Sequence, residues 1–232
     1  MGSPDLKSYL ENIYIIPILI FSVVIHEMAH AWVALKCGDT TAKDLGRITL
    51  NPIPHIDLFG SILVPLFSIL ATGRVFIAWA KPVPIDGRNF RHFKRDDTLV
   101  TIAGPISNLI IALLCSFFVI AIYYITKNTN MQEGSYLFEF LSYMFKMFYA
   151  GILLNVSLAV FNMIPIPPLD GSHIMANILP DELAMKYRQI GFLGIFIILG
   201  LFNFVPGFSR FFSMIITSAA QPYLILVNMF IK

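Results

Sequence analysis

The chain has 232 residues, of which 57% are hydrophobic and only 13% are charged. An average soluble domain carries about a quarter charged residues, so this composition excludes an ordinary soluble protein and indicates a lipid environment. The net charge of +2 is too small to favour a nucleic-acid partner, and two cysteines, Cys37 and Cys115, give no disulfide framework.

The apolar residues gather in blocks, most of them near the ~20 residues that a helix needs to cross the hydrocarbon layer. We interpret the first block as a permanent span, because it is longer than the short apolar run of a signal peptide and no small-residue cleavage site follows it. The last block contains Gln221-Pro222, which leaves open an interfacial helix there. In chain order the blocks are Ile13–Leu35, Leu58–Ala71, Leu99–Ile125, Phe138–Ile164, Tyr187–Phe204 and Phe211–Ile231.

Lys and Arg are concentrated in two polar stretches, Lys36–Asp57 and Thr72–Thr98. Loops rich in these residues tend to stay in the cytoplasm, so we expect both stretches on that side. The block between them, Leu58–Ala71, must then enter and leave by the same face. It has about 14 residues with Pro65 inside, which suits a re-entrant hairpin better than a full crossing.

On this topology the first span runs from outside to inside, Leu99–Ile125 runs outward and Phe138–Ile164 runs inward again. We predict an all-α polytopic protein of the inner (plasma) membrane, with about five to six transmembrane helices and a re-entrant hairpin. The whole of residues 1–232 forms one domain in this prediction, with a core at 13–175 and C-terminal helices at 187–231.

The first span contains His26-Glu27-Met28-Ala29-His30. Histidines at i and i+4 lie on one helix face and can direct nitrogens at one metal ion. The Glu between them lies off that face and can act as general base on a water bound to the metal. The pentapeptide can occur by chance, but burying these groups in lipid without a partner costs a few kcal/mol. The pattern therefore predicts one Zn²⁺ per chain, bound by His26 and His30, with Glu27 as the catalytic base.

A catalytic zinc site needs a third protein ligand, and Asp170 is the best candidate. It follows Phe138–Ile164 in a proline-rich run that ends the helix and leaves extended backbone. Asp before Gly-Ser is also a good N-cap for a helix over Ser172–Leu179, and one carboxylate could serve both roles. His26 lies about 10 Å from the inner end of its span, so both groups are expected at the cytoplasmic side.

Three motifs in this order resemble the site-2 protease family of intramembrane zinc metalloproteases, in its compact bacterial form without a PDZ domain. They are the His26–His30 pentapeptide, Gly104-Pro-Ile-Ser-Asn108, and the Asn-x-x-Pro-x-Pro-x-x-Asp-Gly run from Asn162 to Gly171. Residues Gly46–Pro52 and Ala78–Pro84 are also similar to this subgroup.

The resemblance implies a metalloendopeptidase that hydrolyses peptide bonds in or near transmembrane helices of protein substrates. It implies zinc binding by His26, His30 and Asp170, with Glu27 as base. It also implies that Asn162 binds the substrate carbonyl or the oxyanion, whereas Asn108 either packs in the core by hydrogen bonds or assists catalysis. Single-span regulators such as membrane-bound anti-sigma factors, or leftover signal peptides, are the substrates that it suggests.

The segment Arg47-Ile-Thr-Leu-Asn51 alternates like a short strand and contains β-branched residues. We predict a short β-strand here, near the active site. Its free edge would receive the unwound substrate as an added strand.

Other classes of function use some of the same residues. A zinc-binding membrane transporter or scaffold could use the same ligands without needing Glu27 as a base. A serine protease based on Ser107 lacks a free intramembrane histidine, and an aspartyl mechanism lacks a second intramembrane carboxylate. His55 and His173 could line the entry path or support a ligand, but such residues are more often interfacial, so we leave them outside the ligand set.

Overall fold

The computed structural model describes residues 14–57, 81–129, 132 and 134–231. The predicted hairpin Leu58–Ala71 lies outside these residues. The described elements are α2 (Ile15–Cys37), α3 (Thr41–Asp44), η1 (Ile53–His55), η3 (Gly87–Asn89), α5 (Phe93–Asn128), α6 (Tyr136–Asn162), α7 (Gly171–Ile178), α8 (Asp181–Arg188), α9 (Leu193–Phe204) and α10 (Phe208–Phe230).

The prediction of an all-helical membrane protein is confirmed for this part of the chain. Four of the described helices, α2, α5, α6 and α10, are long and apolar enough to cross a membrane. A fifth span results if α8 and α9, which meet at a bend of 80°, are taken together. In lipid a helix satisfies its own backbone polar groups, which is why apolar blocks of this length become helices.

The strand predicted for Arg47–Asn51 is wrong, because these residues form bends and irregular backbone between α3 and η1. The Thr49 hydroxyl accepts from the main-chain N–H of Asn51, and the Asn51 side chain accepts from the N–H of Ile53. Such local side-chain bonds offer the backbone an alternative to a sheet ladder. No strand occurs anywhere in the described ranges.

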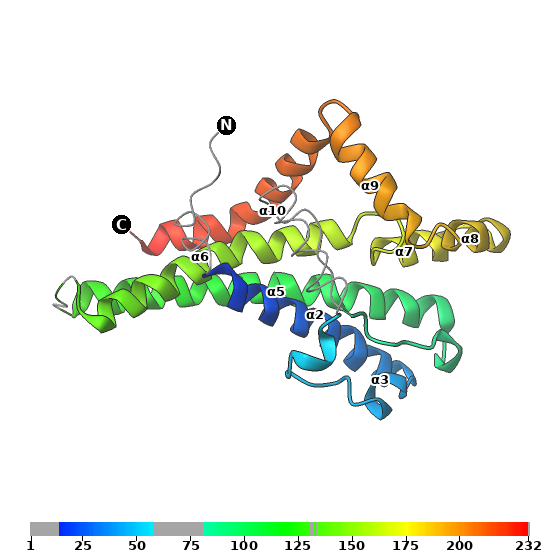
Figure 1. Ribbon diagram of the computed structural model, residues 1–232, viewed down its shortest axis with the longest axis horizontal. Coiled ribbons are helices and arrows are strands. Elements are labelled where there is room, and N and C mark those ends of the chain that lie inside the picture. The colour runs from blue at the N-terminus through cyan, green and yellow to red at the C-terminus, as the bar shows by residue number, and fades with distance from the viewer. Residues whose placement is uncertain (1–13, 58–80, 130–131, 133, 232) are drawn as a thin grey trace.

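The block Tyr187–Phe204, which its composition predicts to be a span, is not one continuous helix. The helix stops at Arg188, and a turn precedes α9. The Tyr187 hydroxyl donates a 2.7 Å hydrogen bond to the carbonyl of Pro165. This bond links the end of α8 to the segment that follows α6, and α9 leaves α8 at a steep angle, as Figure 1 shows.

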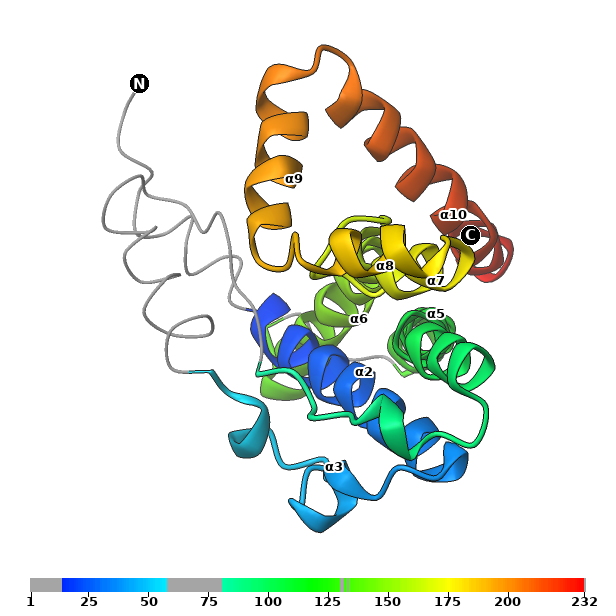
Figure 2. The same cartoon turned by 90° about the vertical axis from the view of Figure 1, so that its right-hand side faces the viewer.

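Helices α2, α5 and α6 form the centre of the fold and alternate in direction (Figure 1). Apolar side chains from all three share a buried cluster that includes Ile18, Cys115, Val119 and Ile152. Helix α10 packs on α5 and α6 through Ala220, which is fully buried. Figure 2 shows α3 on one side of α2, and α9 on the other. This arrangement places the polar residues of three helices face to face inside the bundle.

Candidate metal centre

Two imidazoles lie side by side on α2. His26 and His30 are one helical turn apart, and each residue is only 7% exposed. Their Nε2 atoms are 3.0 Å apart, and their ring planes meet at 84°. The sequence spacing therefore yields the expected pair of nitrogens on one face of the helix.

The carboxylate of Asp170, which is distant in the sequence and lies at the start of α7, approaches the same two nitrogens. Its Oδ2 lies 3.2 Å from Nε2 of His26 and 3.4 Å from Nε2 of His30. One ligand atom from each of the three residues lies within 4.8 Å of the other two. Asp170 also occupies the N-cap position of α7, but its side chain makes no capping hydrogen bond. The carboxylate is therefore directed at the imidazoles.

The outer nitrogens of both rings show which atoms carry protons. Nδ1 of His26 lies 2.6 Å from Oδ1 of Asn108, and Nδ1 of His30 lies 2.7 Å from the carbonyl of Val100. A carbonyl oxygen can only accept, so each Nδ1 must carry the hydrogen. In the neutral rings both Nε2 atoms then hold lone pairs, and the short distance between them is not a hydrogen bond.

With both rings neutral, three electron-pair donors therefore converge at one point. Oδ2 of Asp170 is buried without a hydrogen-bond partner in the described part of the chain. Unpaired buried polar atoms are unfavourable, and three lone pairs facing one another repel unless a cation lies between them. Two imidazoles and one carboxylate form a donor set that suits zinc and leaves a fourth position open. The residues present fit a zinc ion.

The neighbouring helix α5 approaches the imidazoles closely at Gly104. A Cβ at this position would lie 2.4 Å from Nε2 of His30 and 2.6 Å from Cε1 of His26. Only glycine leaves room for both rings here. The glycine of the Gly-Pro-x-x-Asn motif therefore has a packing role that the sequence alone does not show.

One oxygen of the Glu27 carboxylate contacts the segment before η3. Its Oε2 accepts a 2.7 Å hydrogen bond from the main-chain N–H of Val83. Arg47 holds the same segment by donating to the carbonyls of Lys81 and Pro82, at 2.8 and 3.3 Å. The carboxylate therefore has one oxygen bound to the backbone, and its position off the ligand face agrees with the helical spacing.

The remaining candidates lie outside the cluster of three. Nδ1 of His173 is 3.3 Å from Asp97 on α5, and the His173 side chain is 53% exposed. His55 is buried, and its Nε2 lies 3.1 Å from the carbonyl of Thr49. Asn162 ends α6, and its Nδ2 donates to the carbonyl of Leu158 in its own helix.

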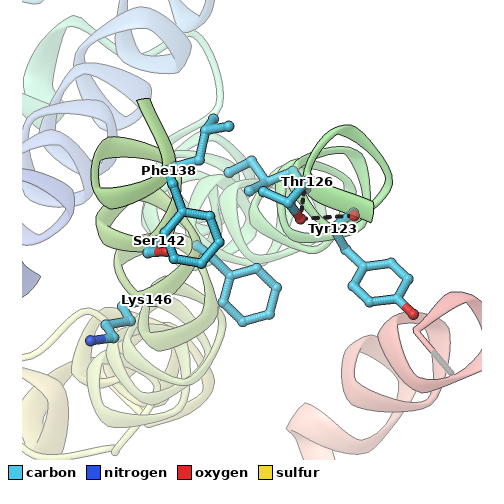
Figure 3. Close-up of a pocket in the computed structure, with 8 residues that line it drawn as sticks. Tyr123, Thr126, Phe138, Ser142 and Lys146 are labelled. Atoms are coloured by element: carbon cyan, nitrogen blue, oxygen red, sulfur yellow. Dashed lines mark hydrogen bonds between the residues drawn. The ribbon is translucent and has the colours of Figure 1, made fainter. Parts of the chain in front are cut away.

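A separate pocket lies between the opposite ends of α5 and α6 (Figure 3). Its volume is about 250 Å³, and its lining is mostly apolar, with Tyr123, Thr126, Phe138 and Lys146 among the residues. Tyr123 follows Asn108 by 15 positions in the same helix, which corresponds to about 22 Å. This pocket is therefore distinct from the metal centre.

Sequence reasoning missed three residues that organise this region: Val83, Asp39 and Asn155. Val83 acts through its main-chain N–H, which leaves no trace in the sequence. Asp39 is fully buried, and its carboxylate accepts hydrogen bonds from Asn89 and from the N–H of Asp86. Asn155 carried a usable signal, because an amide in the middle of an apolar span needs a polar partner.

Comparisons with known proteins fit this centre. The model of peptidase family M50 matches residues 137–202. A Bacillus subtilis protein named "Putative zinc metalloprotease YwhC" is 39% identical over 189 residues, covering 82% of this chain and 80% of that protein. The Mycolicibacterium smegmatis "Putative zinc metalloprotease Rip2" is 26% identical over 200 residues, covering 83% of this chain and 67% of that protein. No solved structure matches.

The chain belongs to peptidase family M50. The resemblance to the site-2 proteases is thereby confirmed, and the protein is a zinc metalloprotease with membrane-spanning helices. The matched region of the family model begins in α6 and ends in α9, so it includes Asp170. The three converging ligand atoms therefore occur in a protein whose relatives are named as zinc metalloproteases.

Proposed function

We propose that this M50 protein is an intramembrane protease that hydrolyses peptide bonds in or near the transmembrane helices of its substrates. In this proposal His26, His30 and Asp170 bind one Zn²⁺, and Glu27 is the general base. The convergence of one ligand atom from each of these three residues within 4.8 Å carries the proposal.

When bound, zinc supplies a Lewis acid that polarises the scissile carbonyl and lowers the pKa of a water molecule. Glu27 takes the proton from the attacking water and passes it to the leaving amine. The Val83 N–H holds one oxygen of Glu27 in place, so that the other oxygen can move the proton. Asn162, at the end of α6, binds the carbonyl oxygen of the substrate.

The depth of the proposed zinc site in the membrane determines whether a substrate helix must unwind before cleavage. His30 is seven residues from the end of α2, or about 10 Å. We place this end at the cytoplasmic face of the plasma membrane, because the basic stretches follow it. A substrate helix hides its peptide bonds behind its own hydrogen bonds, so it must unwind locally before attack.

The test is turnover of a model transmembrane substrate by purified protein in detergent. We expect a chelator to abolish cleavage, and added zinc to restore it. Glu27→Gln should keep the zinc content of the wild type and lower the cleavage rate by about 10²–10⁴-fold, the range of general-base catalysis. Near-normal cleavage by this variant would remove Glu27 from the mechanism.

The same variants distinguish a protease from a zinc transporter. In sealed vesicles a transporter would take up zinc equally well with Glu27→Gln, because transport needs no general base. Zinc uptake by both proteins, together with no cleavage by either, would overturn the proposal.

A further inference from the structure

A chain of buried hydrogen bonds crosses three helices and ends at His26. Nδ1 of His26 on α2 meets Oδ1 of Asn108 on α5 at 2.6 Å. Nδ2 of Asn108 donates to Oδ1 of Asn155 on α6 at 2.9 Å, and Nδ2 of Asn155 donates to the carbonyl of Gly151 at 2.9 Å. Both asparagines are fully buried.

We call the hydrogen bonds that join Gly151, Asn155, Asn108 and His26 the relay. The carbonyl of Gly151 determines which group donates and which accepts at every step of it. An asparagine amide can be placed either way round, but the Gly151 carbonyl can only accept a hydrogen bond. Asn155 must therefore present its NH₂ group to Gly151 and its oxygen to Asn108. Asn108 in turn presents its NH₂ group to Asn155 and its oxygen to His26. His26 can only donate to that oxygen, so its Nδ1 carries the hydrogen.

The relay also determines the protonation of Nε2, the other nitrogen of the His26 ring. With the hydrogen on Nδ1, the Nε2 atom keeps its lone pair, and this atom faces Asp170 at 3.2 Å. A flipped amide anywhere along the relay would place two donors or two acceptors face to face. In a buried site each such mismatch costs about 1–3 kcal/mol.

The packing around the relay restricts its movement. A Cβ at Gly151 would lie 3.0 Å from both Sγ of Cys115 and Cγ1 of Ile18, so the three helices are in close contact there. Ile152 and Val156, which flank Asn155 on α6, are fully buried. The side chain of Asn155 is therefore confined to one position in a tightly packed interior.

We infer that Asn155 is a positioning residue for the metal centre, which fixes the orientation and tautomer of His26 through Asn108. It touches neither the metal nor the substrate in this role. The inference rests on the proposed function of His26 as a zinc ligand. Outer partners of metal-binding histidines typically change metal affinity by about 10–100-fold when removed.

The test is the zinc dissociation constant, measured by competition with a chromophoric chelator, for Asn155→Leu and Asn155→Ala. Leucine fills a similar volume without polar atoms. We expect each variant to bind zinc about 10–100-fold more weakly and to change the visible absorption bands of the cobalt-substituted protein. Ser116→Ala is the matched control, because Ser116 is as buried and donates only to Ala112 in its own helix; we expect it to match the wild type.

The outcomes separate this inference from the proposed function. If His26→Ala loses zinc while Asn155→Leu keeps wild-type affinity and cobalt spectrum, the inference fails and the proposed zinc site stands. An equal loss in Asn155→Leu and Ser116→Ala would also overturn the inference, since it would reflect buried packing alone. Unchanged zinc affinity in His26→Ala would overturn the proposed site itself.

A measurement on the wild-type protein tests the inference even if the Asn155 variants do not fold. Nitrogen-15 NMR of labelled histidine in the zinc-free protein should show His26 protonated at Nδ1. Protonation at Nε2 instead would contradict the direction of the relay.

Discussion

The main-chain N–H of Val83 donates a 2.7 Å hydrogen bond to Oε2 of Glu27. The Val83 side chain is buried and packs with Ala31, which lies one helical turn after Glu27 on α2. The prolines on either side of Val83 have no N–H to offer. The carboxylate that we propose as the base is therefore oriented by one backbone group from a distant segment.

Removal of that backbone donor should impair catalysis without loss of metal. We expect Val83→Pro, in a segment already flanked by prolines, to lower kcat by about 10–100-fold, because a hydrogen bond to a charged group contributes about 1.5–3 kcal/mol. Zinc content and KM should stay near wild type. Val83→Ala keeps the N–H and should retain most activity; equal losses in the two variants would indicate packing rather than orientation of Glu27.

A methyl group at Gly104 should disrupt the imidazole pair. A Cβ there would lie 2.4 Å from Nε2 of His30, so Gly104→Ala must displace a ring or separate α2 from α5. We expect zinc affinity to fall by more than tenfold, about the effect of losing an outer partner of a ligand. Gly200→Ala in α9 meets no atom within 4 Å and should bind zinc normally, and wild-type affinity in Gly104→Ala would show that the rings can adjust.

Replacement of Asp170 by Asn should remove the anionic donor while keeping its shape. We expect Asp170→Asn to lower zinc affinity by about 100-fold or more, since the effect of a direct ligand should exceed that of an outer partner. Competition with a chelator measures this loss. Asp181→Asn, at a side chain 91% exposed, is the control, and a variant at position 170 that binds zinc as well as this control would exclude Asp170 as a ligand.

The buried carboxylate of Asp39 should make stability depend on pH. Burial tends to raise the pKa of Asp39, but hydrogen bonds from Thr41, Asn89 and the N–H of Asp86 lower it below the ordinary value. A lowered pKa in the folded state stabilises the protein above the ordinary Asp pKa of about 3.9, and this stabilisation is lost as the pH falls.

We therefore expect Asp39→Asn to lower the free energy of unfolding by about 2 kcal/mol at pH 7. The difference from the wild type should shrink below about pH 4. Denaturant unfolding in detergent at pH 7 and at low pH measures both values, and other titrating groups cancel because both proteins share them. Asp44→Asn, at an exposed position, is the control; a difference that stays constant with pH would exclude the ionised Asp39 as its source.

The strand that was predicted at Arg47–Asn51, and that the structure does not contain, shows where sequence patterns mislead. Alternation and β-branched residues favour a strand only if a partner strand is available to complete the backbone hydrogen bonds. Here the side chains of Thr49 and Asn51 bond to nearby main-chain N–H groups instead. The apolar blocks were more reliable predictors, because a helix completes its hydrogen bonds without any partner.

The long apolar helices and the pairing of His26 with His30 could be predicted from the sequence, because a helix completes its own backbone hydrogen bonds and its period places residues i and i+4 on one face. The sequence also singled out Asp170 as the strongest candidate for a third ligand, but only the packing of α7 against the bundle decided that its carboxylate meets the imidazoles. The Val83 contact with Glu27 and the direction of the relay through Asn155 were likewise decided in the tertiary structure. These features depend on main-chain donors and acceptors, which every sequence contains and only a fold places.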